Sequence, residues 1–383
     1  MFKRLVYFVM MAAAAVTANA QPWDTVAGDS LVLDIEDIGP HWFSVRGGQI
    51  AYLIDGDSGR VKGTLQLSQF SPAIRPHMDK GMIYAYGSFY TRNVYGDRTD
   101  VVIGFDATTT LPVVEVEIPA RAAGIGHSGM IGLIDDKFIG VWNISPGVSV
   151  SIVNTETNEF VGEVSTPNCA GVYPVDGGFI MACADGRVQL IELDESGAEI
   201  GRRRSEVFFD LEEDPVYDYA VASAEGWIFM SLEGMVYEVT VEGGEVLVTD
   251  GWSINPPDSE TPDRNGFVVT PDDNWRIGGR QPFAYNADTG ILVTVMHQGG
   301  GQETFEDAGT EVWGFNVPTQ RRGYRLAVDD GHEVSSVQLT QDEEPLMMMS
   351  VGGNLEIRNP RTGGLIRVVE DIRGGLIQNL WFD

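Results

Sequence analysis

Five histidines are the side chains of this sequence best suited to hold a metal or to transfer a proton. They are His41, His77, His127, His297 and His332. His77, His127 and His332 each fall near the start of a segment expected to form an innermost strand, so these three could converge on one axis. Three imidazoles can bind zinc. A hydrogen-bonded axial polar ring is the simpler interpretation, and we assign no metal to this chain.

The motifs of the common catalytic sites are absent from the sequence. It contains no nucleophile elbow, no zinc-binding motif, no CxxC pair and no phosphate-binding loop. The triplet Gly299-Gly300-Gly301 lacks the strand-to-helix context of a phosphate cradle. Paired carboxylates such as Asp135-Asp136 are explained by solvated loops in so acidic a chain. These motifs therefore leave the function of the chain open.

The charge balance excludes two classes of partner. The chain has 383 residues, of which 56 are acidic and 25 basic, and its formal net charge is −31. Phosphate binding needs a basic surface, so nucleic acid is excluded as a partner. An anionic membrane surface is disfavoured for the same reason. No segment after the first 20 residues is long and apolar enough to span a membrane.

Residues 1–20 have the pattern of a secretory signal peptide. Lys3 and Arg4 precede an apolar run from Leu5 to Val16, and Ala18-Asn19-Ala20 gives a small-residue cleavage site. Twelve apolar residues are too few to span a bilayer, although an uncleaved anchor is the alternative. We expect export and cleavage after Ala20, followed by an N-terminal extension over residues 21–40. Cleavage removes two basic residues and changes the net charge to −33.

The two cysteines, Cys169 and Cys183, either form a disulfide or remain as two buried thiols. An exported protein with one pair of cysteines most simply joins them, because compartments outside the cytoplasm are oxidising. Closing this loop of about 15 residues would stabilise the fold by roughly 3 kcal/mol through the entropy of the unfolded chain. We predict the Cys169–Cys183 disulfide.

One β-type unit recurs through residues 41–383. Each copy is a strand, a turn, a second strand that closes on Asp, Asn or an equivalent position, a tight turn, and a third strand. Side chains of Asp and Asn accept hydrogen bonds from the following turn, so we treat them as structural. A repeat of about 45 residues with four short strands is typical of a propeller blade, and seven copies predict an all-β, seven-bladed β-propeller. The closing positions are 55, 106, 154, 193, 240, 316 and 359.

The widest spacing between copies, from position 240 to position 316, indicates inserted loops. Trp252 to Asn274 is rich in Pro, Asp and Asn, and Gln298 to Thr310 carries three consecutive glycines. Long loops on a rigid scaffold are common binding sites, although loops without a role are the alternative.

A set of short stretches follows in order over the whole propeller. The stretches are Ile54-Asp55-Gly56, Gly59-Arg60-Val61, Gly96 to Asp100, Phe105-Asp106 with Leu111-Pro112, Cys169 to Gly186, Val207-Phe208, Gln281 to Tyr285, Gly331-His332-Glu333 with Ser336, and Gln341-Asp342-Glu343. Together they resemble the heavy subunit of the quinoprotein amine dehydrogenases, the methylamine and aromatic amine dehydrogenase family. In this resemblance, the segment from Cys169 to Gly186 matches the single disulfide of that family.

The resemblance implies a periplasmic heterotetramer of two heavy and two light subunits. The light subunit would carry tryptophan tryptophylquinone and the catalytic base. Primary amines would be converted to aldehyde and ammonia, and the electrons would pass to a blue copper protein of the amicyanin or azurin type. This chain would carry neither cofactor nor catalytic residue. It would scaffold the light subunit and form one wall of the substrate channel.

One departure from the family concerns the loop before the first Ile-Asp-Gly, which in the methylamine enzymes carries an aromatic residue that lines the channel. Here the loop is Val45 to Gln49 and contains no aromatic residue, so we hypothesise a wider channel and a substrate larger than methylamine. Aromatic area and guanidinium groups are enriched at interface hot spots, although ordinary packing or solvent exposure is the alternative for each residue. The candidate light-subunit or channel contacts are Arg46, Trp275, Arg276, Arg280, Phe283 and Tyr285.

Two other functions fit the same fold. An exported propeller could act without a light subunit, as a ligand-binding or protein-interaction module. Alternatively, a pyrroloquinoline quinone dehydrogenase would have its own site on the propeller axis, and the three axial histidines are its only support in the sequence.

Overall fold

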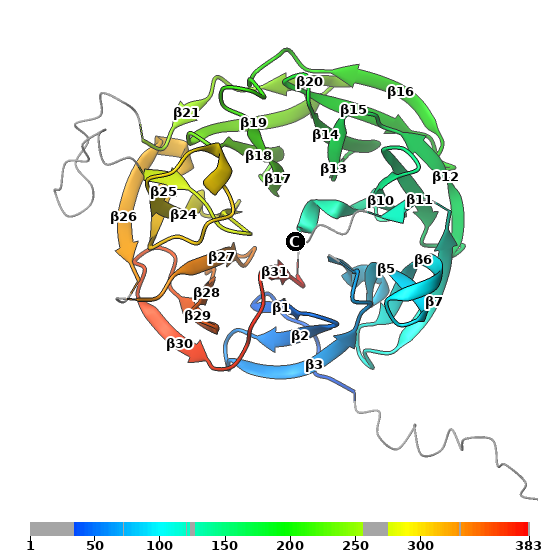
Figure 1. Cartoon of the computed structure of the whole chain (residues 1–383), viewed down its shortest axis with the longest axis horizontal. Coiled ribbons are helices and arrows are strands. Elements are labelled where there is room, and N and C mark those ends of the chain that lie inside the picture. Colours follow the sequence, from blue (N-terminus) through cyan, green and yellow to red (C-terminus); the bar gives the residue numbers. More distant parts are fainter. Residues whose placement is uncertain are drawn as a thin grey trace, which may run out of the picture. The chain divides into compact units, whose positions relative to one another are not determined.

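Seven antiparallel β-sheets stand around a common axis, and Figure 1 shows them as the blades of a propeller. The computed structural model describes residues 34–71, 73–119, 121–122, 127–255, 275–328 and 331–381. The expected signal peptide, residues 21–33 of the extension, and residues 256–274 of the long loop lie outside the described residues. The strands run from Trp42 to Asn379, and the prediction of a seven-bladed all-β propeller is confirmed.

The strands of each blade occupy four positions, which run from the axis outward. Blade 1 contains β31 (Leu376–Asn379), β1 (Trp42–Gly47), β2 (Ile50–Asp55) and β3 (Arg60–Gln66). Blade 2 contains β4 (Ile74–His77), β5 (Met82–Arg92), β6 (Tyr95–Asp106) and β7 (Pro112–Ile118). Blade 3 contains β8 (Arg121–Ala122) with β9 (Ile131–Ile134), then β10 (Phe138–Ser145), β11 (Ser149–Asn154) and β12 (Glu159–Ser165). Blade 4 contains β13 (Cys169–Val175), β14 (Gly178–Cys183), β15 (Arg187–Leu193) and β16 (Glu199–Arg204).

The remaining three blades follow the same plan. Blade 5 contains β17 (Val216–Ala222), β18 (Gly226–Ser231), β19 (Met235–Glu242) and β20 (Glu245–Val248), with β21 (Trp252–Ser253) also on β19. Blade 6 contains β22 (Trp275–Ile277) with β23 (Phe283–Asn286), then β24 (Ile291–Gln298), β25 (Glu311–Asn316) and β26 (Arg321–Ala327). Blade 7 contains β27 (Val334–Leu339), β28 (Met347–Val351), β29 (Asn354–Arg358) and β30 (Leu365–Val369).

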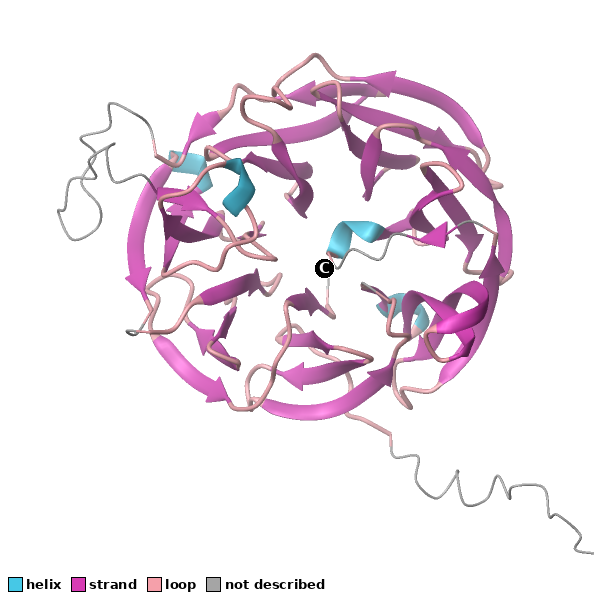
Figure 2. Ribbon diagram, in the orientation of Figure 1, coloured by secondary structure: helices cyan, strands magenta, loops and turns pink. Residues whose placement is uncertain are grey.

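Helical structure is confined to short 3₁₀ turns in the described residues, as Figure 2 shows. We find among these residues no helix with the length and apolar character needed to cross a membrane. The 3₁₀ turns are η1 (Met78–Lys80), η2 (Ser128–Met130), η4 (Gln302–Thr304) and η5 (Val317–Thr319).

The core lies between the blades rather than inside any one of them. The second strand of blade 4, β14, is buried at all six positions, whereas the outermost strand β16 has no buried residue. A strand that is covered on both faces reads as a continuous apolar run, which is the pattern seen in the sequence. Tyr84, Val141 and Phe179, from three successive blades, belong to one buried cluster. Adjacent blades therefore stabilise each other.

The Asp and Asn residues at the ends of the third strands were predicted to accept hydrogen bonds from the following turns. The structure confirms this role in most blades. Asp106 Oδ1 accepts the backbone N–H groups of Thr108 and Thr109, at 3.1 and 2.7 Å. These hydrogen bonds, with that of the Thr109 hydroxyl, lower the pKa of Asp106. Blade 4 uses Asp194, one residue beyond the predicted position. Blade 5 instead turns through Gly243 and Gly244, both at positive φ.

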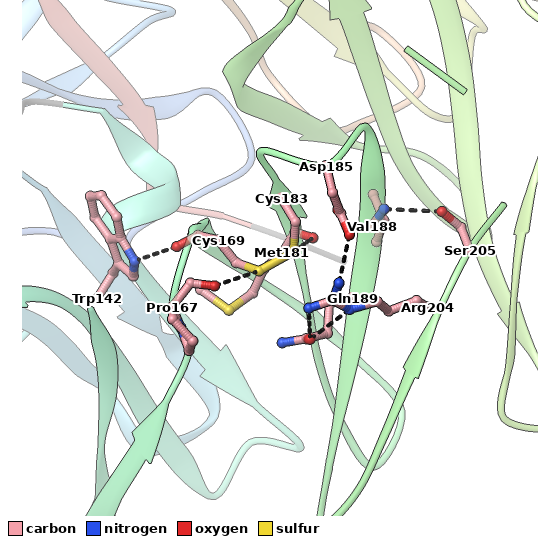
Figure 3. The surroundings of a disulfide bond; sticks show 10 residues. All are labelled: Trp142, Pro167, Cys169, Met181, Cys183, Asp185, Val188, Gln189, Arg204 and Ser205. Carbon is pink, nitrogen blue, oxygen red and sulfur yellow. Dashed lines mark hydrogen bonds and ion pairs between the residues drawn. A yellow bond between two sulfur atoms is a disulfide. The ribbon is translucent and has the colours of Figure 1, made fainter. Parts of the chain in front are cut away.

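The predicted Cys169–Cys183 disulfide is present in the structure (Figure 3). The two cysteines are directly opposed on β13 and β14, with Cα atoms 4.0 Å apart. The Trp142 indole N–H of blade 3 donates to the Cys169 carbonyl at 3.0 Å. The disulfide therefore joins the two inner strands of blade 4, beside the contact with blade 3.

The two ends of the described chain meet in blade 1. The C-terminal strand β31 is the innermost strand of that blade and pairs with β1, from Phe43 opposite Asn379 to Arg46 opposite Leu376. The sequence repeat did not predict this pairing. Because it joins the last innermost strand to the first blade, it closes the ring.

Side-chain amides tie β31 to the neighbouring blades, and we call this set the amide clasp. The Gln378 amide pairs with the backbone of Ile74 in blade 2, donating to its carbonyl at 2.8 Å and accepting from its N–H at 2.9 Å. Gln281, between β22 and β23 of blade 6, pairs in the same way with Ile377, at 2.9 Å for both hydrogen bonds. Asn379 donates to the Leu339 carbonyl of blade 7 at 2.7 Å. These amides satisfy buried backbone groups where innermost strands diverge.

Replacing Gln378 with leucine keeps a similar volume but removes both hydrogen bonds to Ile74. Ile74 is buried, and each unsatisfied buried group costs about 1–3 kcal/mol. We expect Q378L to lower the free energy of unfolding by about 2–4 kcal/mol, measured by denaturant titration. The control Q69L changes an exposed glutamine and should stay within about 0.5 kcal/mol of the parent. Equal stability of Q378L and the parent would contradict this role of the clasp.

Candidate functional site

The antiparallel blades give the propeller two distinct faces. We call the face at which the innermost strands begin the N-face, and the opposite face the C-face. The turns between second and third strands lie on the N-face, and the turns made by Asp and Asn lie on the C-face. Arg46 near the end of β1, the β22 residues Trp275 and Arg276, and Arg280 before β23 therefore all belong to the N-face.

Three arginines surround the segment Gly374-Gly375 on the N-face, and we call Arg46, Arg280 and Arg373 the arginine cluster. A Cβ atom on Gly47 would stand 3.0 Å from the Arg373 carbonyl, and one on Gly375 would stand 3.0 Å from Arg280 Cδ. The Ser336 hydroxyl donates to the Gly375 carbonyl at 2.6 Å, and the Ser350 hydroxyl donates to the Gly374 carbonyl at 3.0 Å. Sequence analysis missed Arg373, for which the adjacent Gly-Gly pair was the only signal.

The charges of this cluster are not neutralised within the part of the chain that the structure describes. Arg46 donates to the carbonyls of Gly48, Ser68 and Gln69, and burial lowers the pKa of its guanidinium. Arg280 and Arg373 are exposed, and neither forms an ion pair with a described residue. The cluster therefore presents positive charge on a strongly acidic protein.

Trp275 and Arg276 are engaged within the chain itself. The Trp275 ring lies 5.7 Å from the Trp313 ring, and the Arg325 guanidinium lies 4.9 Å from the Trp275 centroid. Arg276 pairs with Glu233 and donates to the Gly300 carbonyl. These contacts fix the N-face end of blade 6.

Phe283 and Tyr285 do not lie with the arginine cluster. Phe283 is fully buried and packs against Tyr217 and Tyr219 at centroid distances of 5.9 and 5.0 Å. Its side chain therefore offers no surface to a partner, because alternate residues of a strand face opposite sides and Phe283 faces the interior between blades. Tyr285 is also largely buried and lines an axial cavity.

The three histidines lie at different levels of the propeller. His77 is the last residue of the short strand β4, so it lies on the C-face, and its placement near a strand start was wrong. Its ring N–H donates to the Asp136 carbonyl at 2.8 Å. His127 Nε2 lies 3.3 Å from Asp218 Oδ2, whereas His332 is exposed in the loop before β27. Among the described residues, no group of three or more His, Cys, Asp and Glu side chains could hold a metal ion.

The His127 contact influences the titration of Asp218. Burial raises the pKa of this carboxyl, but the adjacent imidazole lowers it more, and the net pKa lies below its ordinary value. The Tyr219 ring stands edge-on to His127 at 6.5 Å. This pair is a local contact between blades 3 and 5.

An axial cavity of about 110 Å³ is lined by side chains of all seven innermost strands or the turns beside them. Tyr173, Tyr219, Trp227 and Tyr285 supply aromatic surface, and burial raises the pKa of each of these tyrosines, which keeps the phenols neutral. Arg75 is the cationic residue of the lining. Sequence analysis missed this cavity, because each blade contributes residues from a different part of the chain.

Arg75 stays protonated at neutral pH. Burial lowers its pKa to about 10, and the nearby Asp136 carboxylate opposes that effect. With neutral phenols and a protonated guanidinium, the cavity can bind and orient a small polar group. Among the described residues of its lining, no carboxylate or imidazole side chain is present to act as a base.

His41 joins blade 1 to blade 7 on the C-face. Its ring contacts Asp57 Oδ1 at 2.8 Å, Asp342 Oδ1 at 3.3 Å and the Glu344 carbonyl at 3.2 Å. Burial lowers the pKa of His41, but the two carboxylates together raise it more, so its pKa lies above the ordinary value. The protonated form therefore contributes a second link at the closure of the ring.

Comparison with known families gives one match over most of the chain. The family model of the methylamine dehydrogenase heavy chain (MADH) matches residues 35–377. The methylamine dehydrogenase heavy chain of Paracoccus versutus is 26% identical over 335 residues, covering 85% of this chain and 74% of its own length. The corresponding protein of Methylophilus methylotrophus is 23% identical over 316 residues, covering 77% and 70%.

Solved structures share the fold at much lower identity. The dihydro-heme d1 dehydrogenase NirN has a TM-score of 0.53 and 13% identity, with 91% of this chain and 77% of that chain covered. A protein of unknown function from Desulfotomaculum acetoxidans has a TM-score of 0.55 and 12% identity, with 90% and 100% covered. These similarities show the propeller fold alone.

The His41 contacts predict a pH-dependent contribution to stability. The folded-state pKa of His41 is raised above its ordinary value of 6.5. The stabilisation by protonated His41 is therefore complete below pH 6.5 and is lost as the pH rises through the folded-state pKa. We expect H41Q to cost up to about 1 kcal/mol at pH 5.5 and much less at pH 8.5, since partly exposed ion pairs are screened. Thermal midpoints at both pH values measure this difference, with the exposed-site variant H332Q as control. An H41Q deficit that grows with pH would contradict the assignment.

Proposed function

The chain belongs to the methylamine dehydrogenase heavy chain family, and we propose that it is the heavy subunit of an exported amine dehydrogenase. The observation that carries this proposal is the family match over residues 35–377, which spans nearly the whole propeller. The two relatives named methylamine dehydrogenase heavy chain support the same assignment. The signal-peptide pattern of residues 1–20 supports export to the periplasm.

In this proposal, the redox group belongs to a light subunit. Tryptophan tryptophylquinone would be built from two tryptophans of that subunit, and it would accept two electrons from a primary amine as aldehyde and ammonia are released. A blue copper protein would then receive the electrons. No residue of the present chain is needed to hold the group. Its two cysteines are already joined to each other, so the chain could not supply the several disulfides of a light subunit.

The contribution of this chain would be a rigid platform with a defined charge. Interlocked blades hold the N-face loops in fixed positions, which lets them bind a second protein and exclude water from a channel without rearrangement. The arginine cluster supplies positive charge beside the axis, and the chain as a whole is acidic. We propose an assembly of two heavy and two light subunits, as the family resemblance implies.

The N-face loop between β1 and β2 favours an amine larger than methylamine. The turn residues are Gly48 and Gln49, and the Arg46 side chain folds back onto the Gly48 carbonyl and the neighbouring segment at Ser68 and Gln69. No aromatic side chain of this loop would narrow a channel beside it. A larger organic group could therefore pass.

Purification of the tagged chain from its native host tests the proposed function. We expect a smaller, disulfide-rich chain in equal amount and a visible quinone absorption that is bleached by a primary amine. The bleached complex should reduce a blue copper protein. Recovery of this chain alone, with no chromophore and no amine-dependent reduction, would contradict the proposal.

Turnover of amines of different size tests the substrate proposal. We expect kcat/KM of the purified complex to be at least tenfold higher for phenethylamine or tyramine than for methylamine. The variant Q49F, which places a ring in the short exposed turn, should lower the rate with the larger amines and leave methylamine largely unaffected. A clear preference of the parent complex for methylamine would contradict a widened channel.

A further inference from the structure

A two-stranded ribbon in blade 2 extends past the rest of its sheet. Strand β5 pairs with β4 only from Met82 to Ala85, and β6 pairs with β7 only from Asp100 to Phe105. Strands β5 and β6 nevertheless remain paired with each other beyond these limits, up to Arg92 opposite Tyr95. We call residues 89–99 the arm. Its tip is a turn between the second and third strands, so it lies on the N-face.

The base of the arm is held by a buried charged network. Asp100 is 8% exposed, and its carboxylate accepts from Ser88 Oγ at 2.6 Å and from Arg98 Nε at 2.7 Å. Arg98 Nη2 also donates to Ser88 Oγ at 2.7 Å. Such a two-pronged arginine contact fixes direction as well as distance. The arm is therefore held in one orientation relative to its blade.

Aromatic contacts extend this order along the arm and toward the arginine cluster. The Tyr90 ring packs edge-on against Phe70 at 5.5 Å, and the Arg98 guanidinium lies 5.9 Å from the Tyr90 centroid. Phe70 directly follows Gln69, whose carbonyl accepts from Arg46. The arm and the arginine cluster thus belong to one continuous part of the N-face.

The arm exposes apolar surface that its own fold does not cover. Phe89 is 43% exposed, Val94 is 49% exposed and Tyr95 is 60% exposed. Arg92 stacks on Tyr95 at 5.7 Å, which combines a cation with an aromatic ring at the tip. Tyrosine and arginine held in a fixed geometry are the side chains that dominate protein interfaces. Rigid aromatic groups also lose little entropy on binding.

The arm lacks the negative charge that dominates the rest of the protein. The whole chain has 56 acidic and 25 basic residues, whereas in the arm Arg98 is paired with Asp100 and the exposed Arg92 balances the single acid Asp97. The arginine cluster beside it adds three positive charges, none of which forms an ion pair with a described residue. The surface therefore fits a partner that presents acidic groups around an apolar patch.

We propose that the arm and the arginine cluster form the docking surface for the light subunit, on the N-face of the propeller. This inference rests on the proposed function, and it adds the face and the residues that bind. Phe89 and Tyr95 would insert into an apolar patch of the light subunit, while Arg92, Arg280 and Arg373 would meet its carboxylates.

A second copy of this chain is the less suitable occupant. In a two-fold dimer the same patch meets itself, which would place the arginines of one arm against those of the other. Like charges across an interface cost several kcal/mol. A head-to-tail contact avoids this repulsion, but it leads to rings or open filaments rather than to a closed pair. A different, acidic chain satisfies both the charge and the apolar surface.

Two arm variants test the proposal in the full-length chain expressed in the native host. F89S/Y95S removes the exposed rings, and R92E reverses the charge at the tip without removing buried surface. The matched control L365S/V368S removes two side chains that are 52% and 44% exposed on the outermost strand of blade 7. Circular dichroism and thermal midpoints must match the parent for each variant. The readout is the amount of quinone-bearing light subunit that co-purifies with each chain.

We expect each arm variant to retain at least tenfold less light subunit than the parent, and the control to retain the parental amount. Parental amounts on both arm variants would overturn the arm as the docking surface while leaving the proposed function intact. Loss of self-association without loss of the light subunit would assign the arm to a second copy, and would also overturn the inference. If the parent chain brings no quinone-bearing subunit, the proposed function itself fails.

Discussion

The closure of the ring by the C-terminal strand is the constraint on which the rest of this structure depends. A propeller made of consecutive hairpins leaves its first blade without an innermost strand until β31 returns to pair with β1. The amide clasp then joins this strand to blades on both sides, through Gln378 and Ile74 in one direction and through Asn379 and Leu339 in the other. Without it, buried backbone groups would be unsatisfied where neighbouring strands diverge.

Closure also decides which residues share a face. The segment that leads into β31 passes between Arg46 of blade 1 and Arg280, which lies between β22 and β23 of blade 6. The segment also carries Arg373. Three arginines far apart in the sequence are thereby gathered beside the axis. On the other face, His41 links the same two ends of the ring through Asp57 and Asp342. The seam of the propeller thus has polar contacts on both faces.

Among the described residues, those that hold the fold together differ from those that are available for binding. Asp and Asn side chains at the ends of third strands hold turns, and the disulfide staples the inner strands of blade 4. The axial cavity holds neutral phenols and one protonated guanidinium, which suits binding. The N-face carries the arm and the arginine cluster, and the guanidinium groups of that cluster form no ion pair with a described residue. A heavy subunit that leaves the chemistry to a partner would have such a division of roles.

The sequence by itself determined the all-β propeller, its seven blades and the Cys169–Cys183 pair. These features depend on local patterns, because strand periodicity, turn chemistry and a nearby pair of cysteines act over short distances along the chain. It also identified the relevant turn residues, with errors of one position in blade 4 and of turn type in blade 5. Family membership followed from stretches that occur in order along the propeller, and it was then confirmed by the match over residues 35–377.

Only the tertiary structure decided which side chains meet. The sequence predicts Phe283 as an interface contact, but its side chain is buried between blades. His77 was predicted near the start of an innermost strand, but it is the last residue of β4. The axial cavity, the clasp and the arginine cluster each join residues from distant segments, and their positions depend on the length of each strand and on the closure of the ring. Neither quantity is encoded in a local pattern, because a one-residue shift in a strand moves a side chain to the opposite face.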